Sequence, residues 1–330
     1  MKFLRLVLAF VLTVLLLYVA RSTSMGRPDT LAGSDGEYSF AITTVPKILE
    51  NQTDRITLSV TGPTDSTRVW LRTTKMGKAQ PEDLSSYTPV EMHPDGDLPD
   101  DTYGVFVEAG RRGGRFYYYF EVTDMERNRL ATYTPEPGEP FLLKYIGTVP
   151  GWITGLHIFF IFATVFCISL ATVHAGRVVF TGGDPKAMMK PMLWATALCF
   201  MGMIPFGVPM NYFAFDASWE GVPFGHDATD NKTQLLFVYL LFVTLAGRRY
   251  LTGRGGRTGW SRSAIGWFGL GSFAVMLFIY LIPHSIQFTP LFTYAFCYTW
   301  IGIVLALFLF GEIQSRQAPV SDPTPVRGEA

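Results

Sequence analysis

The chain contains 330 residues, of which 48% are hydrophobic, and its 27 Lys and Arg residues balance its 27 Asp and Glu residues. The apolar residues gather in one run at the start of the chain and five runs after residue 149, a pattern that excludes an ordinary soluble protein and predicts a polytopic membrane protein. The basic segments are short, so we expect no nucleic-acid partner.

The first predicted element is an apolar helix in residues 1–22, interrupted only by Arg5. Its apolar run is long for a signal peptide, so we favour a membrane anchor. The alternative is a signal peptide that is cleaved at Ala20-Arg21-Ser22, where small residues flank an arginine.

Residues 36–145 form the next predicted element, an exported β-domain. Apolar and polar residues alternate there, which predicts β-strands, and about seven short strands are typical of an antiparallel β-sandwich. Phe116, Tyr118 and Phe120 share one face by this alternation and are expected in the core. The clearest candidate strands are Arg55–Thr61, Ser66–Thr73, Tyr103–Glu108, Arg115–Thr123 and Pro140–Tyr145.

One stretch of this domain resembles a known fold. Residues 114–128 have the sequence Gly-Arg-Phe-Tyr-Tyr-Tyr-Phe-Glu-Val-Thr-Asp-Met-Glu-Arg-Asn and are followed by Pro135 and Pro140. This pattern resembles the final hairpin of bacterial immunoglobulin-like or fibronectin-III-like domains. The resemblance covers about a third of the chain and implies a domain that binds a partner or acts as a spacer.

Five apolar segments in residues 150–311 predict a bundle of five membrane-crossing helices, so the expected fold class is an α+β membrane protein. Residues 315–330 are rich in Pro and are expected to form a disordered cytoplasmic tail. The five predicted crossings are Ile153–Val173, Pro191–Pro209, Thr233–Ala246, Ala264–Pro283 and Phe288–Phe310.

The distribution of charge predicts the orientation in the membrane. Residues 22–148 contain 19 acids and 13 Lys and Arg residues, whereas residues 247–262 contain five Arg residues and no acid. Basic segments stay on the cytoplasmic side, so both termini are expected there and the β-domain outside. All three cysteines lie in apolar runs and none in the β-domain, which is compatible with a bacterial inner (plasma) membrane.

The outward loop at residues 205–233 has the most distinctive composition in the chain, with many aromatic residues, Gly and Pro. Irregular backbone at membrane depth is tolerated only where it is buried in protein or lines a cavity. We therefore predict that this loop forms a lid over the outer mouth of the bundle. The predicted lid residues are Phe213, Phe215, Trp219, Glu220 and Phe224.

The end of this loop admits two interpretations. Oxygen atoms of Asp227, Asp230 and Asn231 could bind a hard cation such as calcium. Alternatively, Asp230 or Asn231 is the N-cap of the following helix and accepts hydrogen bonds from its free backbone N–H groups. We favour the cap.

Three histidines map to the outer side of the predicted bundle. His157, His226 and His284 could ligate haem b or a divalent metal. The alternative, which we favour, is a structural role in which a histidine bonds to a backbone carbonyl or a hydroxyl group of a neighbouring helix.

The sequence contains no nucleophile elbow, phosphate loop, zinc-protease motif or Rossmann glycine pattern, so we assign no catalytic residue. The favoured function is a non-catalytic interaction, scaffold or sensing subunit of an envelope complex, in contact with membrane lipid and an outer protein partner. The alternative is a redox subunit that binds haem b or a metal through the three histidines. A small-molecule transporter ranks third, because the predicted crossings have no charged residue well inside them.

Overall fold

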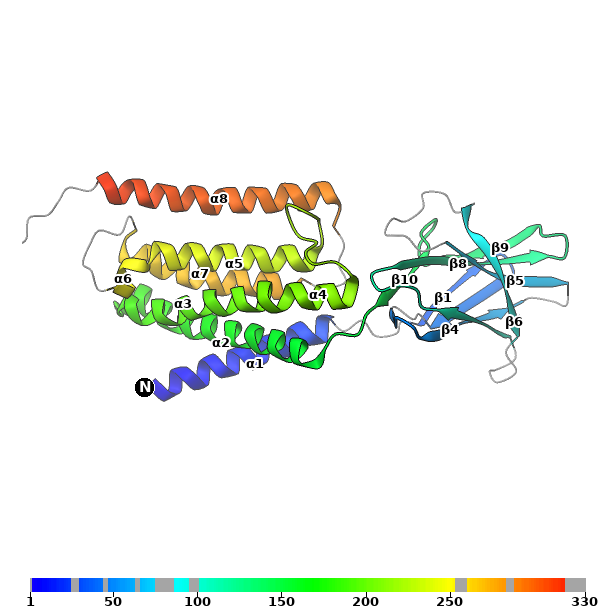
Figure 1. The fold of residues 1–330 in the computed structure, drawn as a ribbon, viewed down its shortest axis with the longest axis horizontal. Coiled ribbons are helices and arrows are strands. Elements are labelled where there is room, and N and C mark those ends of the chain that lie inside the picture. Colours follow the sequence, from blue (N-terminus) through cyan, green and yellow to red (C-terminus); the bar gives the residue numbers. More distant parts are fainter. Residues whose placement is uncertain are drawn as a thin grey trace, which may run out of the picture. The chain divides into compact units, whose positions relative to one another are not determined.

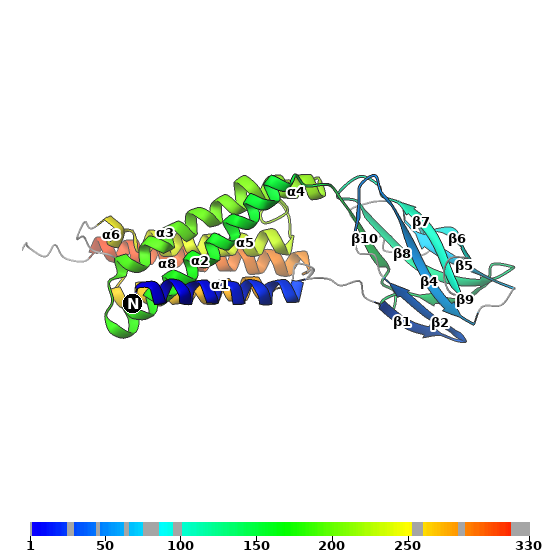
Figure 2. The same ribbon diagram turned by 90° about the horizontal axis from the view of Figure 1, so that it is seen from below.

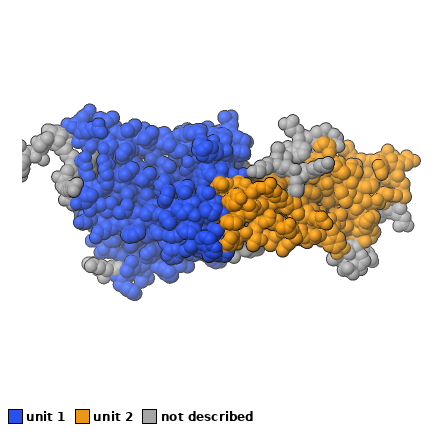
Figure 3. Space-filling model, in the orientation of Figure 1, with its two compact units in different colours: residues 1–25, 151–209, 219–330 blue, residues 26–150, 210–218 orange. Residues whose placement is uncertain are grey.

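The computed structural model describes residues 2–24, 30–43, 47–62, 66–74, 86–94, 101–252, 260–282 and 288–317. The chain divides into two compact units, shown in different colours in Figure 3. The helical unit comprises residues 1–25, 151–209 and 219–330, and the β unit comprises residues 26–150 and 210–218. Each unit has its own hydrophobic core.

The described residues of the β unit form ten strands in one curled sheet (Figure 1). The sheet is mixed, because β3 pairs with β10 in parallel while the other named pairs are antiparallel, so the prediction of a purely antiparallel arrangement is wrong. The order is β1-β2-β4-β7-β6-β5-β8-β10-β3, with β9 beside β8. The strands are β1 Thr30–Asp35, β2 Tyr38–Thr43, β3 Lys47–Leu49, β4 Thr53–Thr61, β5 Thr67–Thr73, β6 Thr88–Pro94, β7 Thr102–Glu108, β8 Arg115–Asp124, β9 Arg129–Tyr133 and β10 Phe141–Ile146.

The core of the β unit lies between the two halves of the curled sheet. Strand β6 pairs with both β5 and β7 and so links the halves. Phe40 from one half stacks on Tyr133 from the other, with ring centroids 5.1 Å apart. Phe116, Tyr118 and Phe120 are buried in this core, as their alternation predicts.

The described residues include four helical segments that are long and apolar enough to cross a membrane, and the last residues of the second segment, 210–215, belong to the β unit. Three of these segments are the helices α2, α7 and α8. The fourth is a continuous segment formed by α3, the π-helix η2 and α4. The helix α5 is not among them, because polar residues fill its first two turns. The bounds are α1 Lys2–Ser24, α2 Gly151–Thr181, α3 Pro185–Met201, η2 Gly202–Gly207, α4 Val208–Phe215, α5 Ala228–Ala246, α6 Arg248–Thr252, α7 Arg262–Leu281 and α8 Pro290–Gln317.

Most helix bounds differ from the sequence prediction; for example, α2 ends at Thr181 rather than Val173, and α5 begins at Ala228 rather than Thr233. The second predicted crossing starts at Pro185 rather than Pro191, because Asp184 caps it. It also continues past Pro209 to Phe215, because the wider π-helical turn accommodates Pro205. The last helix reaches Gln317, and the rest of the predicted tail, residues 318–330, lies outside the described residues.

Consecutive long helices of the helical unit alternate in direction (Figure 1). One end therefore contains the N-terminal ends of α1, α3 and α7 and the C-terminal ends of α2, α5 and α8. We call it the basic end because Lys and Arg residues lie in these turns. The opposite end contains the N-terminal end of α5 and the C-terminal end of α7, and we call it the loop end.

Candidate functional site

At the loop end, residues 219–227 fold over the first turns of α5, and we call them the cap loop. Asp227 is the N-cap of α5, since its Oδ1 accepts hydrogen bonds from the backbone N–H groups of Thr229 at 2.7 Å and Asp230 at 3.0 Å. The sequence predicts the cap at Asp230 or Asn231, and the helix begins earlier because Asp227 satisfies its first free N–H groups.

Side chains in the first two turns of α5 hold the backbone of the cap loop. The N–H of Glu220 donates to Asp230 Oδ2 at 2.7 Å, and the N–H of Val222 donates to Asn231 Oδ1 at 2.8 Å. Gln234 Nε2 donates to the carbonyl oxygen of Val222 at 3.1 Å. Asp230 and Asn231 are buried, so losing one of these bonds leaves a backbone group without its partner away from water. The loop is thereby held in one conformation.

Lys232 extends this arrangement to a second helix. Its buried side chain donates from Nζ to the carbonyl oxygen of Ile282 at 3.0 Å, directly after the last residue of α7. The lysine therefore ties the start of α5 to the close of α7.

This geometry matches the capping interpretation better than the cation interpretation. Oxygen atoms of Asp227, Asp230 and Asn231 accept hydrogen bonds from different backbone N–H groups. In the part of the chain that the structure describes, no group of three or more His, Cys, Asp or Glu side chains is placed to hold a metal ion.

The five predicted lid residues fall in two different units. Phe213 and Phe215 belong to the β unit, whereas Trp219, Glu220 and Phe224 belong to the helical unit. Phe224 is 83% exposed, so the cap loop presents an aromatic side chain on its surface while its polar groups face inward.

Within the β unit, residues 210–218 pack against the turn after β7 and the end of β10. Gly147 donates its N–H to the carbonyl oxygen of Ala214 at 2.8 Å, and a Cβ at position 147 would lie 2.1 Å from the Phe213 carbonyl oxygen. Arg112 pairs with Asp216 at 3.3 Å and lies over the ring of Tyr212. The sequence prediction missed this contact, and the adjacent pair Arg111 and Arg112 was its one visible sign.

The three predicted ligand histidines do not form a site in the described residues. His157 Nδ1 donates to the carbonyl oxygen of Gly202 at 3.0 Å, which joins α2 to the π-helical turn η2. His226 is exposed on the cap loop, and His284 lies outside the described residues. The haem or metal prediction gains no support from this geometry, and His157 has the kind of bond that a structural role requires.

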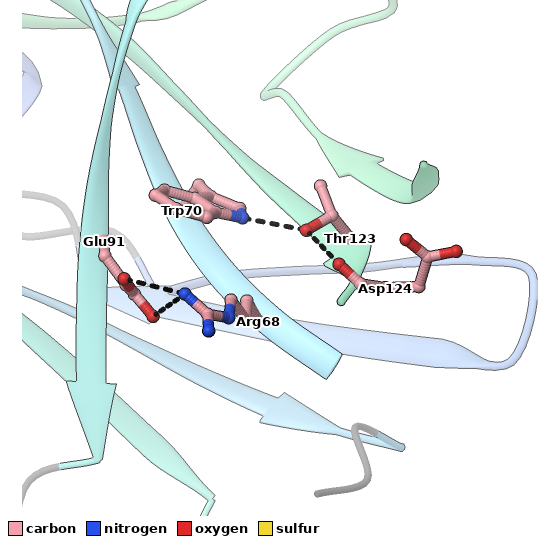
Figure 4. Close-up of polar contacts among 5 residues, drawn as sticks. All are labelled: Arg68, Trp70, Glu91, Thr123 and Asp124. Carbon is pink, nitrogen blue, oxygen red and sulfur yellow. Dashed lines mark hydrogen bonds and ion pairs between the residues drawn. The ribbon is translucent and has the colours of Figure 1, made fainter. Parts of the chain in front are cut away.

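A polar ladder covers the face of β5 and β8 that points away from the core of the β unit. Figure 4 shows that Trp70 Nε1 donates to Thr123 Oγ1, at 2.9 Å, and that this hydroxyl donates to the carbonyl oxygen of Asp124, at 3.1 Å. The same view shows Arg68 paired with Glu91 at 3.3 Å.

The most buried ion pair of the ladder joins Arg72 Nε and Glu121 Oε2 at 2.8 Å. Hydrogen bonding to the Glu121 carboxylate raises the pKa of the Arg72 guanidinium. Beside them, Tyr87, Tyr117 and Tyr119 form a small buried cluster, and burial raises the pKa of Tyr87 to about 12. Arg72 and Glu121 neutralise each other and the tyrosine rings pack together, which fits a structural role for this face. The buried Tyr87 hydroxyl has no hydrogen-bond partner among the described residues.

The β unit also contains a largely apolar cavity of about 300 Å³, lined by residues of β5, β6, β7, β8 and β10 together with Thr74. Its lining includes Leu71, Val90, Val105 and Phe106. Phe106 is 69% exposed, and the Arg55 guanidinium lies 5.2 Å from the centre of its ring. The cavity is thus open and bordered by an exposed aromatic side chain.

Comparison with models of known protein families and with characterised proteins found no match for this chain. Function therefore has to be inferred from the geometry of the chain itself.

Proposed function

We propose that this chain is a non-catalytic interaction or scaffold subunit of a bacterial envelope complex. It has five membrane crossings and an N-terminal anchor, with α5 counted as a crossing beside the four apolar segments, and its β unit is an exported sandwich of the immunoglobulin type. The four apolar helices support membrane insertion. The burial of aromatic side chains between two halves of one sheet supports a sandwich.

The orientation follows from the two ends of the helical unit. The turns at the basic end contain most of its Lys and Arg residues, which favours a cytoplasmic location. The cap loop contains acids and no Lys or Arg, which fits the outer side. The β unit follows α1 and precedes α2, so it is placed outside on this assignment.

The observation that favours partner binding most is the open apolar cavity of the β unit. Phe106 and Val90 leave apolar surface exposed at the cavity. Exposed apolar surface beside a cavity is typical of a protein-binding site. We propose that an apolar side chain of an outer protein partner enters this cavity.

Photo-crosslinking in intact cells tests this function. A photoreactive phenylalanine analogue replaces Phe106 in the full-length chain, and the matched control places it at Met125, which is exposed at the close of β8. The expected result is a discrete crosslinked protein at position 106 that is absent at 125 and lost when Val90→Glu is added. Identical products at both positions, or none at 106, contradict the proposal.

A further inference from the structure

A second cavity, of about 470 Å³, lies at the basic end of the helical unit. Four side chains that can hold positive charge border it: Arg5, His174, Lys186 and Lys190. They come from α1, α2 and α3, and Figure 2 shows the start of α1 beside the turn that joins α2 to α3. Residues far apart in the sequence therefore converge on one space.

The Arg and Lys side chains at this cavity form no ion pair with an acid that the structure describes. None of the ion pairs found between described residues includes Arg5, Lys186 or Lys190. By contrast, Arg248 at the same end is neutralised by an ion pair with Glu312, at 2.8 Å. Unpaired cations that converge on one cavity are available to an anionic ligand.

One acid, Asp184, is among the described residues that line the cavity. Its Oδ1 accepts a hydrogen bond from the backbone N–H of Lys186 at 2.9 Å, because Asp184 is the N-cap of α3. A single capping carboxylate does not offset Arg5, Lys186 and Lys190, so the cavity has a net positive charge.

We propose that this cavity binds the phosphate headgroup of an anionic phospholipid. Arg and Lys are the side chains that bind phosphate oxygens, and basic pockets between membrane helices bind anionic headgroups. Leu6 and Leu170 also line the cavity and give it an apolar side. That side matches the glycerol and first methylene groups of a lipid, whereas a free phosphate ion has no apolar part.

Native mass spectrometry of the full-length chain in mild detergent tests this site. Dioleoylphosphatidylglycerol is titrated against dioleoylphosphatidylcholine, and retained lipid is counted on the intact protein. We expect preferential retention of phosphatidylglycerol by the parent chain. In R5Q/K186Q, we expect its affinity to fall roughly fivefold per removed charge.

Two controls separate the cavity from general charge. R249Q/R316Q removes two cations that do not line the cavity, and we expect it to retain phosphatidylglycerol like the parent. Asp184→Asn keeps a good N-cap residue but removes the one acid among the described residues that line the cavity, so we expect it to increase retention. Equal loss in R5Q/K186Q and R249Q/R316Q would overturn the proposal.

Inorganic phosphate distinguishes the two sources of this chemistry. Thermal unfolding of the full-length chain is followed with phosphatidylglycerol, with phosphatidylcholine, or with inorganic phosphate alone. Stabilisation by phosphatidylglycerol that R5Q/K186Q lacks supports a lipid site. Stabilisation by inorganic phosphate without any by phosphatidylglycerol, or no difference between the two lipids, overturns it.

Discussion

At the loop end of the helical unit, the side chains of Asp230, Asn231 and Lys232 are buried and each bonds to a backbone group of another segment. At the basic end, Arg5 and Lys186 border an open cavity and form no ion pair with a described acid. Polar side chains that bond to backbone groups of the same chain stabilise its fold. Cations that border one cavity without an ion pair are available to an anionic ligand.

Asn231→Ala is expected to cause the largest loss of stability. It removes the acceptor of the Val222 N–H and the donor to the Asp227 carbonyl oxygen, both at 2.8 Å. Leaving a buried backbone donor unpaired costs about 1–3 kcal/mol. The measurement is thermal unfolding of the full-length chain, followed by a thiol-reactive fluorophore, because Cys167, Cys199 and Cys297 all lie in the helical unit.

Thr229→Ala is the matched control for that variant, since it changes the same turn of α5 at a side chain for which the structure shows no hydrogen bond. We expect its unfolding temperature to stay near that of the parent. If Thr229→Ala and Asn231→Ala fall equally, the cap loop is not held by the Asn231 amide.

Glu121→Ala extends the comparison to the β unit and is expected to cost nearly as much. It leaves the Arg72 guanidinium without its carboxylate; this side chain is 26% exposed, so the cost should be about 1–2 kcal/mol, below the roughly 3 kcal/mol for a fully buried pair. Hydrogen–deuterium exchange of β5 and β8 in the full-length chain measures the effect. Glu91→Ala, which breaks the more exposed pair with Arg68, is expected to cost under about 1 kcal/mol. Equal exchange in the two variants contradicts the distinction.

Asp227→Ala is expected to have an intermediate effect on the helical unit. Loss of an N-cap costs about 1 kcal/mol, because the N–H groups of Thr229 and Asp230 lose their acceptor. Asp227→Asn should restore most of the loss, since Asn is also a good cap. The same thiol-labelling melt checks both, and a failure of Asn to recover stability would point to a role for the charge itself.

Glu312→Gln is expected to have the smallest effect. Its carboxylate pairs with Arg248 at the basic end, and both side chains are partly exposed, so the pair contributes under about 1 kcal/mol. The difference from the parent should shrink further in high salt, because exposed pairs are screened. A large effect that persists in high salt would show that the basic end also depends on charge pairing for its structure.

The sequence predicts elements well where one periodicity dominates. The dense aromatic run in Arg115–Thr123 correctly predicts β8, and Phe116, Tyr118 and Phe120 share its core face as expected. The burial of the opposite face, where Tyr117 and Tyr119 lie, was not predicted. About seven strands were predicted and ten are found among the described residues; β1, β2, β3, β6 and β9 were not among the clearest candidates. For β3 and β9, three to five residues give too little pattern. The parallel pairing of β3 with β10 depends on contacts that no local pattern contains.

The candidate sites were predicted less completely, because they depend on convergence. The composition of the segment Asp227–Gln234 indicates a helix cap or a cation site. It does not predict which groups of other segments bond to Asn231 and Lys232. The sequence shows Arg5 as an interruption in an apolar run. It does not predict that Arg5 lies near Lys186 and Lys190, because this depends on how three helices pack together.

The most direct test of the contrast between the two ends is one thermal unfolding series on full-length Asn231→Ala and R5Q/K186Q, in detergent with and without phosphatidylglycerol. Without lipid, we predict that Asn231→Ala unfolds several degrees below the parent, since about 1 kcal/mol shifts the midpoint by roughly 2–4 °C in a unit of this size, and that R5Q/K186Q matches the parent. Added phosphatidylglycerol should stabilise the parent and Asn231→Ala but not R5Q/K186Q. If R5Q/K186Q instead unfolds early without lipid and still responds to it, the cations at the basic end are structural and the contrast is wrong.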